Sequence, residues 1–238
     1  MRATVDHTSS PPVLAALALA ATLGAAPALA GHEGAVHMEV GAPAGAFDEH
    51  VDNLGFGFSL DYAYSGDGPL AVGIGGDFLI YGHQTVVMSL PLVEDFEYNT
   101  DNNIASIFLL ARLHGGDGRV IPYVEGRFGG GYIWTETKLT DEDWYDDDEI
   151  ARQTNWDDFM TIWGGGGGLK IMLKRGDPRD RESKDVLLDM KIVYRHGARA
   201  SYLTEGAISV DVNDRVRIRP SSSETDLLQF ELGVAVRF

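Results

Sequence analysis

The 238-residue sequence contains no cysteine, and basic residues are scarce, with 19 Lys and Arg against 36 Asp and Glu. The absence of cysteine excludes disulfides and thiolate metal sites. The resulting net charge of −17 argues against nucleic acid as a partner, because phosphate binding needs a basic surface. Beyond the N-terminal region, no apolar run is long enough to be a transmembrane helix. Glycine is abundant instead, with 29 residues.

The N-terminal region differs in composition from the rest of the chain. Val13 to Ala26 is an apolar, alanine-rich run, which Pro27 interrupts before the small residues around Ala30. The run is too short to cross a bilayer as a helix, which needs about 20 residues. This layout predicts a secretory signal peptide over residues 1–30, cleaved after Ala30, and a single exported domain over residues 31–238.

A period-two alternation of apolar and polar residues repeats along the exported domain. Such alternation is typical of β-strands that present one apolar face and one polar face. One segment, 104–113, is apolar nearly throughout, and Arg112 sets its inward face. The pattern predicts strands over 36–42, 54–64, 70–80, 104–113, 120–134, 159–173, 186–194 and 227–238.

The number and length of these segments predict an all-β fold, an eight-stranded antiparallel transmembrane β-barrel with up-and-down connections. About ten residues suffice for a tilted strand to cross a bilayer, and the barrel must close because an open edge leaves backbone groups unsatisfied in hydrocarbon. Short, turn-rich links alternate with longer segments at 43–53, 82–102, 137–156 and 202–224, which we expect to be external loops. A secreted β-sandwich or lipocalin-like barrel, with the apolar faces turned inward, is the alternative.

The charged residues of the polar faces support the membrane barrel. Assigned to the interior, six acids meet six bases, although the whole chain is strongly acidic. A narrow and poorly hydrated interior tolerates charges only when they are paired. We therefore expect a charge network in the lumen formed by Glu39, Asp61, Asp77, Glu125, Asp189, Glu231, Arg112, Arg127, Lys170, Lys191, Arg195 and Arg237.

Residues 35–238 resemble a small outer-membrane β-barrel of the OmpA/OmpX-like superfamily. The final residues, with Gly233, Val236 and Phe238, are similar to the C-terminal signal that the outer-membrane assembly machinery recognises. The stretch Pro122-Tyr123-Val124-Glu125-Gly126 also resembles a strand of that group. The resemblance implies the outer membrane of a Gram-negative-type bacterium, with membrane lipid and the assembly machinery as partners and no cofactor.

We expect a barrel with a charge-paired, plugged lumen and a structural or surface-interaction role, and the alternatives are a lipid A-modifying enzyme and a narrow channel for small solutes. Outer-membrane lipid A deacylases use a lipid-facing His-x-Ser pair, but here His196 is followed by Gly197 and Ala198. No two histidines have metal-ligand spacing on one strand face, so we expect neither a catalytic nor a metal site. The acidic run 141–149 suggests either a solvated loop or a divalent-cation site.

Overall fold

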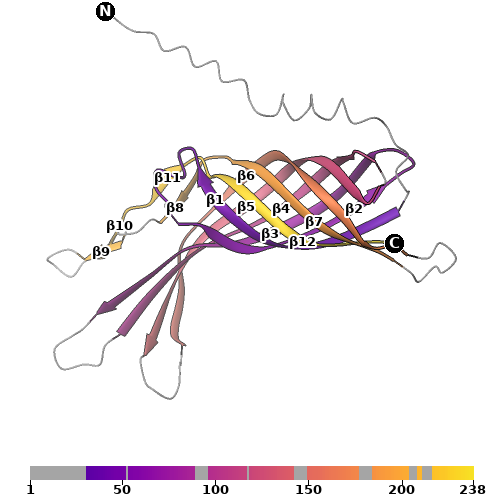
Figure 1. The fold of residues 1–238 in the computed structure, drawn as a ribbon. Helices are drawn as coiled ribbons and strands as arrows, with labels where there is room; N and C mark the ends of the chain where they lie inside the picture. The colour runs from indigo at the N-terminus through magenta and orange to yellow at the C-terminus, as the bar shows by residue number, and fades with distance from the viewer. Residues whose placement is uncertain are drawn as a thin grey trace, which may run out of the picture.

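The computed structural model describes residues 31–51, 53–88, 96–116, 118–141, 149–176, 184–203, 208–210 and 216–238. The predicted signal peptide and most of the acidic run 141–149 lie outside the described residues. Eight long strands close into one barrel (Figure 1): β1 (Gly31–Ala44), β2 (Gly55–Ser65), β3 (Leu70–Met88), β4 (Phe96–His114), β5 (Val120–Asp141), β6 (Glu149–Lys174), β7 (Asp185–Gly197) and β12 (Asp226–Arg237).

Every strand of the barrel pairs antiparallel with its neighbours in sequence, and β1 pairs with β12 to close the wall. The closing register sets Glu39 opposite Glu231 and Val36 opposite Val234. Two backbone hydrogen bonds between His32 and Phe238, each 2.9 Å long, complete the seam. The predicted all-β, eight-stranded antiparallel barrel with up-and-down connections is therefore confirmed.

The two ends of the barrel differ. The turn end carries the short links 66–69, 115–119 and 175–184, together with the first residue of β1 and the last of β12. The loop end carries the longer connections, including two small sheets between β7 and β12. These sheets pair β8 (Ala200–Tyr202) with β11 (Ser221–Ser223) and β9 (Ile208–Val210) with β10 (Val216–Ile218).

The expectation that residues 82–102 and 137–156 are loops was wrong. Paired strand continues through most of both segments, to Met88 in β3 and from Phe96 in β4, and to Asp141 in β5 and from Glu149 in β6. These extensions project beyond the barrel at the loop end (Figure 1). The backbone N–H and C=O groups of each extension bond to the neighbouring extension. The backbone can therefore remain in strands there without an apolar face toward lipid.

The barrel wall alternates as the period-two pattern predicts. Outward side chains are large, apolar and exposed, as with Met38 at 78% and Ile107 at 62%, whereas the inward residues between them are mostly buried. Because the inward side chains are mostly buried, the buried interior of the molecule is the lumen itself. Among the described residues, no helix is long and apolar enough to cross a membrane.

Candidate functional site

The lumen contains a layer of buried ion pairs whose partners come from opposite walls of the barrel. Arg112, on β4, is fully buried and donates from Nη1 to Glu33 on β1 (2.9 Å), from Nη2 to Asp61 on β2 (3.0 Å) and from Nε to Glu125 on β5 (2.7 Å). Lys170 on β6 also donates to Glu33. One guanidinium therefore ties four strands together across the bore.

A second group of charges lies beside the first. Arg127 donates from Nε to Glu125 (2.6 Å), and its Nη2 lies 2.7 Å from Glu231. Lys191 Nζ lies 2.5 Å from Asp61 and 3.0 Å from Glu231. Each carboxylate in this group faces two cations or more, which offsets the cost of removing it from water.

Histidine and hydroxyl groups extend the network. Nε2 of His37 lies 3.2 Å from Asp189, and its Nδ1 lies 3.8 Å from Glu231. Ser59 donates to Glu231 (2.5 Å), and Tyr123 donates its hydroxyl hydrogen to Asp189 (2.6 Å). Glycine at position 168 leaves room for the Tyr123 side chain, because a Cβ on Gly168 would lie 2.5 Å from the tyrosine ring.

Nearer the loop end the charges are fewer and less completely paired. Arg195 Nη1 lies 3.3 Å from Asp77 and donates to Ser106 (2.9 Å). Gln229 donates to one oxygen of Glu39, whose other oxygen has no protein partner. Bound water is the ordinary partner for such buried polar atoms.

The structure places all twelve residues of the expected network on the inward face, and most of them in the contacts above. Arg237 is the least buried of them and lies at the turn end, where its Nη2 is 3.1 Å from Glu33. Sequence reasoning did not include Glu33, His37, Ser59, Tyr123 or Gln229 in the network. Each shares strand parity with a residue that was included, so continuing the alternation to the ends of the strands and counting neutral polar groups would have found them.

With Glu33 included, buried carboxylates outnumber buried lysines and arginines in the described lumen. Seven carboxylates, from Glu33, Glu39, Asp61, Asp77, Glu125, Asp189 and Glu231, are buried with five lysines and arginines, and Arg237 at the turn end adds a sixth cation. His37 lies between two of these carboxylates, those of Asp189 and Glu231.

Apolar side chains gather toward both ends of the lumen. Toward the loop end, Phe47 is fully buried, and its ring makes edge contacts with Tyr81 (5.3 Å) and Tyr202 (5.1 Å). Phe47 comes from the β1–β2 connection and Tyr202 from β8, so residues outside the barrel wall fill its mouth. The turn end is filled by a smaller buried cluster of Ala35, Ile121, Met172, Leu187 and Ala235.

The residues of the expected assembly signal lie at the turn end of β12. Phe238 is 56% exposed, with its ring centroid 6.0 Å from that of His32 and the Lys184 ammonium 5.1 Å away. Val236 is partly exposed on the wall. Gly233 faces inward, where a Cβ would clash with the Val36 carbonyl oxygen, so this glycine has a packing reason of its own.

His196 lies on the outward face near the loop end. Its Nδ1 lies 2.7 Å from Asp226, and its ring packs on Trp163 with centroids 4.8 Å apart. A carboxylate on one ring nitrogen is the arrangement that orients a catalytic base. Within the described part of the chain, no hydrogen bond joins a hydroxyl group to the other ring nitrogen.

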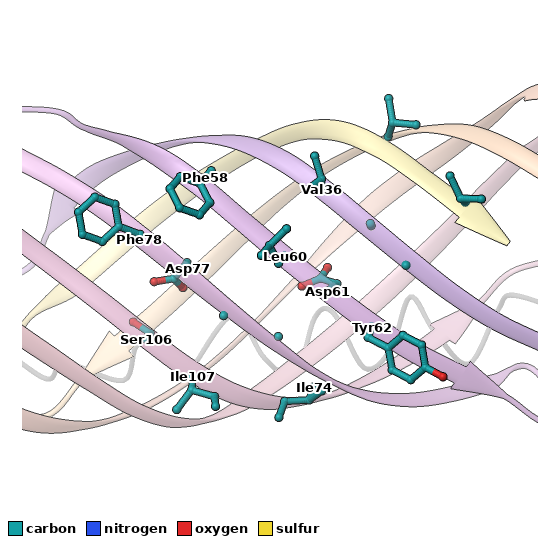
Figure 2. Close-up of a pocket in the computed structure, with 16 residues that line it drawn as sticks. Val36, Phe58, Leu60, Asp61, Tyr62, Ile74, Asp77, Phe78, Ser106 and Ile107 are labelled. Atoms are coloured by element: carbon teal, nitrogen blue, oxygen red, sulfur yellow. The ribbon is translucent and has the colours of Figure 1, made fainter.

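A shallow hollow of about 790 Å³ lies in the outer wall across β12 and β1–β4 (Figure 2). Its outward lining is apolar, and Asp61, Asp77 and Ser106 form its floor from the inward face. The outward side chains that surround it are Val36, Phe58, Leu60, Tyr62, Ile74, Phe78 and Ile107. An apolar recess on an apolar wall suits a lipid chain.

A closed barrel of eight tilted strands with an apolar outer band and a charged, filled interior is the architecture of small outer-membrane proteins. The chain is a transmembrane β-barrel of that kind. Its exterior fits the expected location in an outer membrane. The rim near the loop end carries Trp163, Tyr132 and Trp134, and aromatic side chains of this type form the girdle at a membrane interface.

Comparisons with known proteins give structural likenesses only. No family model matches the chain, and no curated protein matches it. Neisserial surface protein A is 12% identical with a TM-score of 0.39, over 87% of this chain and 94% of that one. Ail of Yersinia pestis, solved with the heparin analogue sucrose octasulfate, is 15% identical with a TM-score of 0.40, over 88% and 97%. A major outer membrane protein of Thermus thermophilus is 17% identical with a TM-score of 0.38, over 86% and 99%.

Proposed function

We propose that the protein is a structural, non-conducting barrel of the outer membrane whose loop end serves surface interactions. The observation that carries the proposal is the position of Arg112, which is fully buried and bonded to carboxylates of three other strands. A guanidinium held in this way crosses the bore where a permeating solute would have to pass. Displacing it would leave unpaired buried charges, which costs about 3–5 kcal/mol.

The apolar side chains toward both ends of the lumen support the same proposal. A hydrated ion entering from the loop end would have to lose water beside Phe47, and one entering from the turn end would pass the Arg237–Glu33 ion pair and then lose water beside Leu187. Dewetted apolar constrictions oppose ion passage.

Conductance in a planar bilayer tests the closed lumen. We expect the purified barrel to insert, to migrate anomalously on a gel until it is boiled, and to show no steady current. Steady current through the wild type that changes ion selectivity on Arg195→Ala would establish the narrow-channel alternative and overturn this proposal.

The surface-interaction part of the proposal rests on the extensions of β3–β6. These strands pair as a sheet beyond the barrel wall, where membrane spanning does not require them. Shortening the β3–β4 extension by removing residues 85–99 should leave the heat-dependent gel shift intact while lowering attachment of cells to surfaces. Attachment equal to that of the wild type would remove this role.

The lipid A-modifying enzyme is the second candidate, and the His196–Asp226 contact is the observation that favours it. We expect no fatty acid release from lipid A, because no hydroxyl group among the described residues forms a hydrogen bond with the other ring nitrogen. Release that is lost in His196→Ala, with the gel shift retained, would establish the enzyme.

A further inference from the structure

The pairing of β7 with β12 brings together three possible metal ligands that are far apart in sequence. Leu227 pairs with Arg195, so Asp226 and His196 are the next positions toward the loop end. Glu224 precedes β12 by two residues and lies beside them. One ring nitrogen of His196 and one carboxylate oxygen each of Glu224 and Asp226 all lie within 4.8 Å of one another. This cluster is on the outer surface, and the lumen network does not use it.

Asp226 is held in place by groups that are not themselves ligands. Its Oδ2 accepts a hydrogen bond from the Tyr194 hydroxyl (2.7 Å), and its Oδ1 accepts one from the Gly197 backbone (3.2 Å). The carboxylate therefore has a fixed orientation toward His196. Outer hydrogen bonds of this kind are what orient the ligands of protein metal sites.

The charge of the cluster calls for a cation. Asp226 is only 6% exposed, although its strand position is outward, at the rim where the wall meets the membrane interface. Within the described residues, no lysine or arginine forms an ion pair with Asp226 or Glu224. Glu224 is exposed beside Asp226, so two neighbouring carboxylates share this rim, and keeping the buried one charged beside lipid is costly without a cation.

We propose that His196, Glu224 and Asp226 bind a divalent transition-metal ion of the zinc class at the outer rim of β7 and β12. Zinc accepts imidazole nitrogen and carboxylate oxygen together, in tetrahedral sites where three protein ligands leave the fourth position open. Calcium fits poorly, because it takes six to eight oxygen ligands. At the rim, the open fourth position faces the layer of lipid headgroups, whose phosphate oxygens or water can complete the coordination.

Titration of the full barrel, refolded in detergent micelles, with ZnCl₂ in a calorimeter tests the site. Excess Ca²⁺ in every titration occupies sites made of carboxylates alone, such as one in the acidic run 141–149. We expect one zinc per chain, and loss of that binding in His196→Ala. Because Co²⁺ reports tetrahedral coordination through its visible absorption, a Co²⁺ titration should show the same stoichiometry and displacement by zinc.

Three further variants make the test specific. Glu224→Gln removes an exposed ligand with little risk to folding and should weaken zinc binding at least ~10-fold, and Tyr194→Phe should weaken it by about 10-fold through Asp226. His50→Ala, at an exposed histidine outside the cluster, should bind as the wild type does. The gel shift before boiling confirms folding of each variant. No saturable zinc binding by the wild type, or equal binding by wild type and Glu224→Gln, would overturn the proposal and leave the closed-lumen function untouched.

Discussion

The two faces of strand β12 share one backbone but lie in opposite surroundings. Phe230, Leu232 and Val234 are exposed on the outside, whereas Gln229 and Glu231, which point the other way, are buried among charges. A soluble protein has the reverse arrangement, with apolar side chains inside and charged side chains outside. The comparison teaches that in this barrel an outward residue contributes through its transfer to lipid, whereas an inward residue contributes through its partners across the bore.

The largest expected effect comes from removing an inward charge. Arg112→Ala leaves Glu33, Asp61 and Glu125 buried without their shared guanidinium, so the free energy of unfolding should fall by about 3–5 kcal/mol. Urea unfolding in lipid vesicles measures the change. The matched control is Arg119→Ala, an exposed turn arginine, which should change it by less than about 0.5 kcal/mol. Equal effects of the two variants would mean that the lumen charges are solvated.

Adding a charge to the outer face should have the next largest effect. Leu232→Arg puts a cation against the hydrocarbon and should lower the stability by about 2–4 kcal/mol. Val236→Arg, on the same face but close to the turn end, should cost only about 0–1 kcal/mol, because the cost falls toward the interface. If Leu232→Arg folds in vesicles as well as the wild type does, the assignment of this face to lipid is wrong.

A smaller effect is expected where an inward hydroxyl is lost without a change of charge. Ser59 donates to Glu231 and contacts His37 Nδ1, so Ser59→Ala should lower the unfolding free energy by about 1–2 kcal/mol. Ser222→Ala removes an exposed hydroxyl and serves as the control. No difference between the two variants would show that water replaces the serine in the lumen.

The smallest effect on stability is expected at Phe238, although its effect in cells should be large. Phe238→Ala keeps the backbone bonds to His32 and removes a half-exposed ring, so refolding of the purified chain in detergent should be nearly unchanged. If the ring is read by the assembly machinery, the amount of folded barrel in the outer membrane should drop. Equal surface levels for variant and wild type would exclude the assembly signal.

The strands and their faces could be predicted because each membrane-spanning strand has lipid on one side and a packed bore on the other. Its residues must therefore alternate between apolar and polar. That constraint applies only to residues within the membrane, so it could not predict the extensions of β3–β6. Above the interface both faces of a strand meet water, and a sequence such as Thr135 to Asp141 carries no apolar alternation. Glu33 was omitted because the first apolar position of its strand was taken as Val36.

The cluster at His196 could not be predicted from spacing within one strand. Its carboxylates come from β12 and the residues before it, and only the register between β7 and β12 brings them to the histidine. That register depends on pairing across a connection of 28 residues, from Ala198 to Thr225. The lumen network was easier to anticipate, because parity alone assigns a side chain to the bore, whatever its partner.

The central claim is that the bore is closed at both ends around its charges, and the absence of cysteine makes a direct measurement simple. Ala63 faces the lumen and is 2% exposed, whereas Ser222 is exposed at the loop end. A water-soluble maleimide should label Ser222→Cys within minutes in the refolded barrel and should leave Ala63→Cys unlabelled until the barrel is unfolded. Labelling of Ala63→Cys at the rate of Ser222→Cys in the folded state would contradict the closed lumen.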